Sequence, residues 1–178
     1  MKKKSYSRRR PRIKNLIPPA ILITATLLQA TLSPYLKING VHPDFVLVLV
    51  IGWTTLRGLP EGLTWSLIGG LSLDFLSGAP FGIFTLVMLA VMGVTLVFHG
   101  RLFGSSIIIP LSLTFPLSLL FNGLALFLLN LLGRPIVWEE VFPILLIPIA
   151  IFNTVVMLFL FPLLNLLNRW LNPQPLSI

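Results

Sequence analysis

Cysteine is absent from this chain of 178 residues, and charged residues make up only 10% of it. The lack of cysteine excludes a disulfide scaffold, an iron–sulfur cluster held by thiolates and a thiol nucleophile. The scarcity of charge excludes an ordinary soluble domain, because about a quarter of the residues of such domains are charged. Hydrophobic residues instead make up 56% of the chain, and its mean hydropathy is +0.95. This composition is typical of a protein that lies largely within lipid.

The common motifs of catalysis and of nucleotide binding are also missing. The sequence contains no His-Glu-x-x-His zinc motif, no Gly-x-Ser-x-Gly nucleophile turn and no Gly-Lys-Ser/Thr phosphate loop. Gly69-Gly70 lies in an apolar stretch, so we interpret it as a site of close helix packing. We therefore expect no catalytic residues, no cofactor, no metal and no enzymatic activity.

The formal net charge of +8 comes from the N-terminal tail. Eight cations precede residue 15, and the other five cations equal the acidic residues in number. An anionic cytoplasmic leaflet attracts a basic cluster placed directly before an apolar stretch. Residues 1–15 are therefore predicted to be a basic cytoplasmic tail that binds lipid and no nucleic acid. A cleaved signal peptide is the alternative, but apolar segments continue to the C-terminus.

The predicted fold class is all-α, a polytopic membrane bundle. A helix needs about 20 apolar residues to cross the hydrocarbon core. Charges, glycines and prolines divide residues 16–170 into about six transmembrane helices, and residues 171–178 form a C-terminal tail. The predicted spans lie near residues 16–36, 41–56, 61–78, 81–98, 105–132 and 139–168.

Six spans place both termini in the cytoplasm. Outside the tail, three cations then lie on the inner side and two on the outer side, namely Arg57, Arg101 and Arg169 against Lys37 and Arg134. With the tail included, this distribution satisfies the positive-inside rule. The tryptophans are expected to anchor the bundle at the interfaces, Trp53, Trp65 and Trp170 at the inner one and Trp138 at the outer one. The same topology separates His42 from His99, so these histidines cannot share a site.

A helical hairpin is predicted around Leu59. Pairing positions whose numbers sum to 118 sets charge against charge, indole against indole and carboxylate against carboxylate: Arg57 with Glu61, Trp53 with Trp65, and Asp44 with Asp74. Each aspartate lies 13 residues from the charge at the turn, which is about 20 Å of helix. Both carboxyl groups are thus predicted within the membrane, where an ionisable residue is a functional candidate.

The two aspartates call for different explanations. Asp44 follows Pro43 in the first turn of its helix, so we expect it to cap that helix. Asp74 lies near the C-terminal end of its helix, where the dipole repels a negative charge. Another group must hold it, and Arg134, an asparagine and a partner protein are the candidates. We also expect Asn122, Asn130 and Asn153 to link helices by hydrogen bonds.

Small residues recur at four-residue spacing along the third predicted span, at Gly62, Ser66, Gly70, Asp74 and Gly78. Such a row lets another backbone approach closely, from this chain or from a partner. We predict that the second and third spans present a groove to a partner's transmembrane helix. The predicted partner-binding residues are Asp74, Gly70, Gly62, Ser66, Gly78 and Asp44.

The sequence resembles the MreD family of the bacterial rod-shape system. The residues that carry the resemblance are the run Gly62-x7-Gly70-x3-Asp74-x3-Gly78-x-Pro80-x-Gly82 and, before it, Pro43-Asp44. The resemblance implies a multi-pass protein of the bacterial inner membrane without enzymatic activity. It further implies binding to MreC, a single-span protein, and a link between the MreB cytoskeleton and the SEDS glycosyltransferase and transpeptidase that build sidewall peptidoglycan.

The alternative is a solute-binding S-component of an energy-coupling-factor vitamin transporter, to which this family is similar in its six-helix layout. S-components tend to dock through an Ala-x-x-x-Ala row in the first span. Here Ala20, Ala25 and Ala30 are five residues apart, which scatters them around the helix. This spacing favours the scaffold over the transporter subunit.

Overall fold

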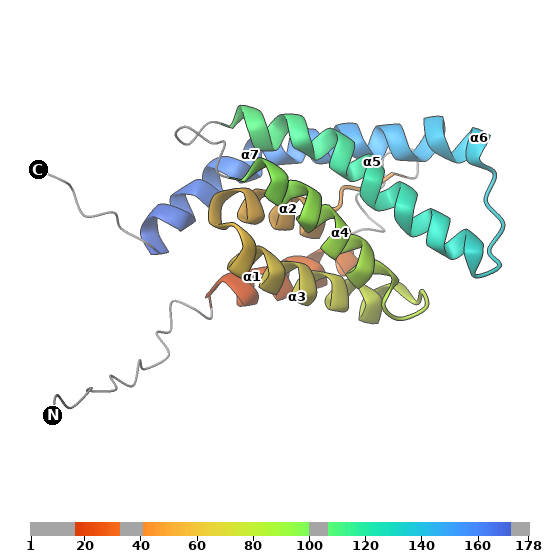
Figure 1. Cartoon of the computed structure of the whole chain (residues 1–178), viewed down its shortest axis with the longest axis horizontal. Helices are drawn as coiled ribbons and strands as arrows, with labels where there is room; N and C mark the ends of the chain where they lie inside the picture. Colours follow the sequence, from red (N-terminus) through yellow and green to blue (C-terminus); the bar gives the residue numbers. More distant parts are fainter. Residues whose placement is uncertain (1–16, 33–40, 100–106, 172–178) are drawn as a thin grey trace, which may run out of the picture.

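The structure, a computed structural model, describes residues 17–32, 41–99 and 107–171, and their regular structure is helical (Figure 1). The elements are α1 (Ile17–Leu32), α2 (Phe45–Arg57), α3 (Leu59–Ser77), α4 (Ile83–Phe98), α5 (Ile108–Leu131), α6 (Trp138–Val141), the π-helix η2 (Phe142–Leu146) and α7 (Ile147–Leu171). The all-α prediction is confirmed, and each predicted span contains one helix or the continuous stretch from α6 to α7. The basic tail, Lys37, Arg101 and the C-terminal tail lie outside the described residues.

Two helical stretches are long and apolar enough to cross a membrane. They are Ile108–Leu131 and the continuous stretch Trp138–Leu171. Shorter apolar helices cover Ala20–Thr31, Phe45–Arg57 and Ile83–Phe98.

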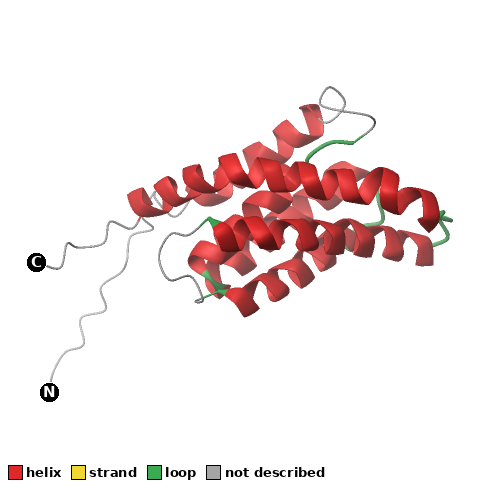
Figure 2. Cartoon of the chain, turned by 90° about the horizontal axis from the view of Figure 1, so that it is seen from above, coloured by secondary structure: helices red, strands yellow, loops and turns green. Residues whose placement is uncertain are grey.

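Helix α2 forms the centre of the bundle, with α1, α3, α4, α5 and α7 packed around it (Figures 1 and 2). Its sequence is apolar on every side, and 10 of its 13 residues are buried. A helix without a polar face is stable only when other helices or lipid surround it. Here the other helices do so, and α2 supplies the middle of the hydrophobic core.

The predicted hairpin of α2 and α3 is confirmed at its turn. Arg57 Nε lies 3.1 Å from Glu61 Oε2, and Gly58 makes the turn with φ +73°. The indoles of Trp53 and Trp65 stack with their ring centroids 4.7 Å apart. The ion pair and the indole pair therefore form as the symmetric pairing of positions about Leu59 predicts.

The interfacial role predicted for two of the tryptophans is wrong. Trp53 is 0% exposed and Trp65 is 1% exposed, so neither indole can contact lipid or interfacial water. Trp53 donates a hydrogen bond from Nε1 to Glu61 Oε2 at 2.9 Å. Because that bond satisfies the indole N–H inside the hairpin, the ring has no need of interfacial water.

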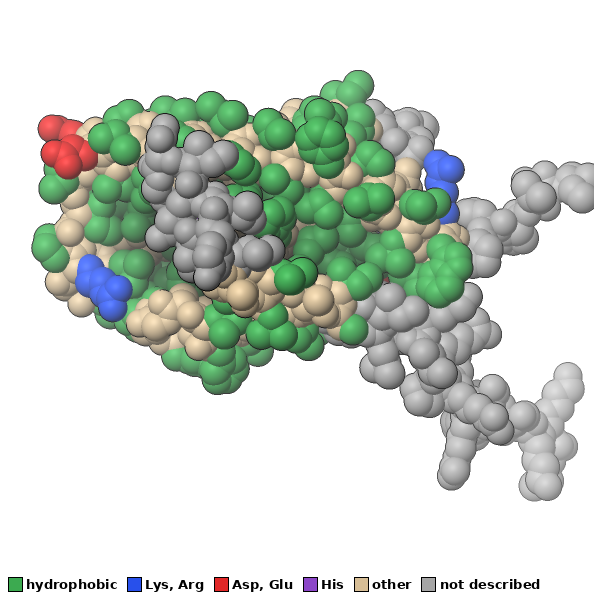
Figure 3. Space-filling model, turned by 180° about the vertical axis from the view of Figure 1, so that it is seen from behind, with side chains coloured by type: hydrophobic (Ala, Val, Ile, Leu, Met, Phe, Trp, Pro, Cys, Tyr) green, Lys and Arg blue, Asp and Glu red, His purple; other side chains and the backbone are tan. Residues whose placement is uncertain are grey.

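The outer surface of the bundle is largely apolar. Figure 3 shows hydrophobic side chains over most of one face, with charged side chains only toward its two ends. Phe75, Phe81, Leu86 and Phe159 are each more than 60% exposed. Large hydrophobic side chains are thus exposed on several helices, and such a surface fits contact with lipid.

Candidate functional site

The first buried polar group is Asp74, whose carboxylate binds the start of α4. Its Oδ1 accepts a hydrogen bond from the backbone N–H of Phe84 at 2.9 Å. Its Oδ2 accepts bonds from the backbone N–H and the hydroxyl of Thr85, at 3.1 and 2.5 Å. These N–H groups lie in the first turn of α4, where a local capping side chain would usually bind them. The residue before α4 is Gly82, which has no side chain, so Asp74 caps α4 from the neighbouring helix.

Close contact between α3 and α4 places Asp74 within reach of these groups. A Cβ atom added to Gly70 would lie 2.5 Å from the Cα atom of Thr85. Gly62 and Gly69 make similar approaches to side chains of α2, at 2.8 Å from Thr54 and 2.9 Å from Val46. The small residues of α3 therefore bring it close to two helices of its own chain.

The second buried polar group is Asp44, which lies at the start of α2 and is 7% exposed. Its Oδ2 accepts hydrogen bonds from the side-chain amides of Asn122 on α5 and Asn153 on α7, at 3.0 and 3.4 Å. The backbone N–H of Asp44 donates to Asn153 Oδ1 at 2.7 Å, and the Asn153 amide also donates to Ser118 Oγ at 3.1 Å. One carboxylate thus joins α2, α5 and α7.

Asp44 does not cap α2 with its side chain, which corrects the sequence-based expectation. The side-chain oxygen of Gln29 on α1 instead accepts the bond from the Val46 N–H at 3.0 Å. The Asp44 carboxylate is turned toward Asn122 and Asn153, whose charge-assisted bonds replace the capping bond.

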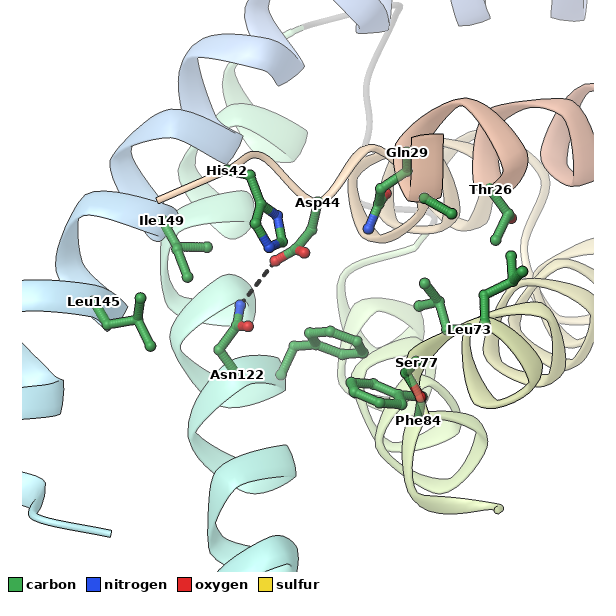
Figure 4. A pocket seen from close by; sticks show the side chains of 13 residues that line it. Thr26, Gln29, His42, Asp44, Leu73, Ser77, Phe84, Asn122, Leu145 and Ile149 are labelled. Carbon is green, nitrogen blue, oxygen red and sulfur yellow. Dashed lines mark hydrogen bonds between the residues drawn. The ribbon is translucent and has the colours of Figure 1, made fainter. Parts of the chain in front are cut away.

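A cavity of about 480 Å³ lies beside Asp44 (Figure 4). Its polar lining comes from Thr26, Gln29, His42, Asp44, Ser77 and Asn122. The rest of the wall is apolar and includes Leu73, Phe84, Phe121, Leu145 and Ile149. In the described parts of the chain, no group of three or more His, Asp or Glu side chains could hold a metal ion.

Comparison with known families identifies the chain. The family model of the rod shape-determining protein MreD matches residues 10–171. The chain belongs to the MreD family. No curated protein and no solved structure matched it. Membership of a shape-determining family gives this MreD protein a role in rod-shape determination, and nothing in the comparison indicates enzymatic activity.

The predicted pairing of the two aspartates holds only in part. Both are buried near the end of the α2–α3 hairpin that lies away from its turn. Asp44 binds α5 and α7, whereas Asp74 binds α4, so they belong to separate hydrogen-bond networks. Within the described residues neither Arg134 nor an asparagine holds Asp74, since its partners there are backbone N–H groups and a threonine hydroxyl.

Partner binding by Asp74, Gly70, Gly62, Ser66, Gly78 and Asp44 stays a prediction. Five of these residues are buried within this MreD protein, and Gly78 at the end of α3 is exposed. Their described contacts are to helices of the same chain, so an effect on a partner would pass through the shape of the bundle.

The sequence places His42 only relative to His99. It does not single out Gln29, Ser118 or Thr85, which also belong to the site. His42 lines the cavity next to Asp44. The only local signal was the spacing His42-Pro43-Asp44, which puts an imidazole two residues before a buried carboxylate. The scatter predicted for the alanines of α1 holds only in part, because Ala30 lines this cavity whereas Ala20 and Ala25 line the same groove elsewhere.

The hydrogen bonds of Asn122 and Asn153 with Asp44 are expected to stabilise the bundle by different amounts. Asn153→Ala is expected to lower the free energy of unfolding by about 2 kcal/mol, and Asn122→Ala by about 1 kcal/mol. Asn153 is fully buried and makes three hydrogen bonds, whereas Asn122 is only partly buried. Unfolding in detergent micelles titrated with a denaturing detergent would measure both losses.

Asn130→Ala is the matched control. The Asn130 side chain makes no hydrogen bond to any residue within the described ranges, so its predicted role as a link between helices is wrong. Its replacement is expected to change the free energy of unfolding by less than about 0.5 kcal/mol. Equal losses for all three variants would contradict the assignment of the network to Asn122 and Asn153.

Proposed function

We propose that this MreD protein is a multi-pass scaffold of the bacterial plasma membrane, with six spans and both termini in the cytoplasm. Three features support this topology. Each of the six predicted spans contains a helix, and the surface between the ends of the bundle is apolar. Figure 1 shows that α1 starts and α7 ends on the side of the α2–α3 turn, while the α3–α4 and α5–α6 connections lie on the opposite side.

The proposed function is to hold a single-span partner of the MreC kind and thereby link the MreB cytoskeleton to peptidoglycan synthesis. The observation that carries this proposal is the family match over residues 10–171. The fold adds that the described residues form one helical bundle with an apolar exterior, a surface suited to binding other helices in lipid. In this role the protein positions other proteins and catalyses no reaction itself.

The surface that we propose for the partner helix is a groove of about 540 Å³ between α1, α2 and α7. It is lined by Ala20, Ile21, Thr24, Ala25, Leu28, Phe45, Leu49 and Leu160. Alanine and threonine on one wall let a helix backbone approach closely, which is the main requirement for helix association in lipid. The groove contains no charged residue, so an apolar transmembrane helix is its matching occupant.

Cysteine cross-linking tests this surface, because the chain has no cysteine of its own. Leu28→Cys places one thiol at the groove, and Leu86→Cys places one on α4, away from the groove, where Leu86 is 64% exposed. With single cysteines introduced along the transmembrane helix of the MreC partner, oxidation is expected to give disulfides at Leu28 and none at Leu86. Equal cross-linking at the two positions, or cross-linking only at Leu86, would contradict the proposal.

A further inference from the structure

Two polar atoms next to this cavity have no hydrogen-bond partner among the described residues, and of these only Asp44 Oδ1 is open to it. Both described side-chain bonds to Asp44 reach Oδ2, and Oδ1 receives none from the residues that the structure describes. Nδ1 of His42 is buried and likewise has no partner among them. Figure 4 shows the two side chains next to each other at the cavity, with Asn122 below them and bonded to the carboxylate.

The open atom, Asp44 Oδ1, only accepts hydrogen bonds when the carboxyl group is ionised. No lysine or arginine lines the cavity, so the Asp44 carboxylate has no permanent countercharge there. A buried carboxylate is costly unless a cation or hydrogen-bond donors compensate it. The polar end of the cavity is therefore complementary to a cation that carries N–H groups.

The apolar part of the cavity wall indicates that the rest of the ligand is apolar. Leucine, isoleucine and phenylalanine side chains of α3, α4, α5 and α7 form it, together with Leu145 of η2. A volume of about 480 Å³ falls within the range of small-molecule sites, which are mostly apolar with a few placed polar groups.

We propose that this cavity binds a primary ammonium group attached to an apolar body, with the ammonium donating to Asp44 Oδ1 and the body packed against Phe84, Phe121 and Ile149. Two sources supply this chemistry, a lipid with an ethanolamine headgroup and a free amphiphilic amine. The site is separate from the groove proposed for the partner helix, so it stands whether or not that groove binds MreC.

The first experiment compares two probes of nearly equal shape, 2-phenylethylammonium and 2-phenylethanol, on the purified full-length protein in detergent. Binding is followed by the change in melting midpoint with probe concentration. The ammonium is expected to bind about tenfold more tightly than the alcohol, because its hydrogen bonds to the carboxylate are charge-assisted. Equal affinity for the two probes would overturn the proposal.

Asp44→Asn is the deciding variant. It keeps one oxygen for the amides of Asn122 and Asn153 and turns the other acceptor into an NH₂ donor. The preference for the ammonium is expected to disappear in this variant and to persist in Glu140→Gln, which removes an exposed carboxylate on α6. Persistence of the preference in Asp44→Asn would overturn the proposal.

A second variant keeps the proposal testable if Asp44→Asn does not fold. Ala30→Trp adds bulk to the cavity wall and removes none of the hydrogen bonds around Asp44. Both probes are expected to bind at least tenfold more weakly to Ala30→Trp than to the original chain. Unchanged binding would show that the probes sit elsewhere and would overturn the proposal.

Native mass spectrometry from nanodiscs of mixed phosphatidylethanolamine and phosphatidylglycerol separates the two sources. Retention of phosphatidylethanolamine by the original chain, and its loss in Asp44→Asn, would assign the site to the lipid headgroup. Tight binding of 2-phenylethylammonium without retained phosphatidylethanolamine would assign it to a free amine. A chain that retains no phosphatidylethanolamine and does not prefer the ammonium probe would overturn the proposal.

Discussion

Replacing Gly70 with leucine is expected to lower the free energy of unfolding by about 3 kcal/mol or more, among the larger effects of a single substitution. The first added atom would already lie 2.5 Å from the Thr85 Cα atom and 3.2 Å from the Phe84 carbonyl oxygen. These are backbone atoms, so no side chain can rotate to make room. Helix α4 would have to move away from α3, and the bonds from Asp74 to Phe84 and Thr85 would lengthen. Denaturing-detergent titration would measure the loss.

Gly93 provides the matched control for this substitution. Like Gly70 it lies within a helix, in this case α4. An added Cβ atom at Gly93 would have nothing within 4 Å. Gly93→Ala is therefore expected to be neutral or stabilising by up to about 1 kcal/mol, since alanine favours a helix more than glycine does. Gly70→Ala should already be destabilising. A Gly70→Ala variant as stable as Gly93→Ala would show that α3 and α4 are not in contact at this point.

Asp74→Ala is expected to destabilise the bundle by about 3 kcal/mol. The substitution removes the acceptor of three hydrogen bonds and leaves the N–H groups of Phe84 and Thr85 unpaired at the start of α4. It also removes a negative charge from the positive end of that helix dipole. Denaturing-detergent titration gives the change in stability, and hydrogen exchange would locate the loss at the first turn of α4.

Two variants separate this role of Asp74 from a general effect of charge. Asp74→Asn keeps one acceptor oxygen and is expected to lose about half as much stability as Asp74→Ala. Glu139→Ala removes a carboxylate that is exposed on α6 and is expected to change the free energy of unfolding by less than about 0.5 kcal/mol. If Asp74→Ala were as mild as Glu139→Ala, the cap on α4 would contribute little.

The α2–α3 hairpin could be predicted from the sequence because its partners are close in the chain. Arg57 and Glu61 are four residues apart, and Trp53 and Trp65 meet because the same short turn sets their depth. Counting residues from the turn is then enough to predict which side chains of the two helices lie opposite each other. It does not reveal whether an indole faces lipid or the core, because that depends on the helices that close over the hairpin.

The hydrogen-bond partners of the aspartates could not be predicted in the same way. Asn122 and Asn153 lie 78 and 109 residues from Asp44, and no local spacing relates them. For Asp74 a signal was present but not used: Gly82, which lacks a capping side chain, directly precedes α4. The cavity depends on how five helices and η2 pack together, so the sequence showed its polar residues without showing that they meet.

The burial of α2 has a consequence for how the protein is assembled during synthesis. At 13 residues it is about 20 Å long, which is too short to cross the hydrocarbon core unaided. Its neighbours in the chain offer a solution, because Arg57 and Glu61 already bind across a turn of one glycine. We expect the nascent chain to insert α2 and α3 together as a preformed pair, so that weakening this turn would lower the amount of protein that reaches the membrane.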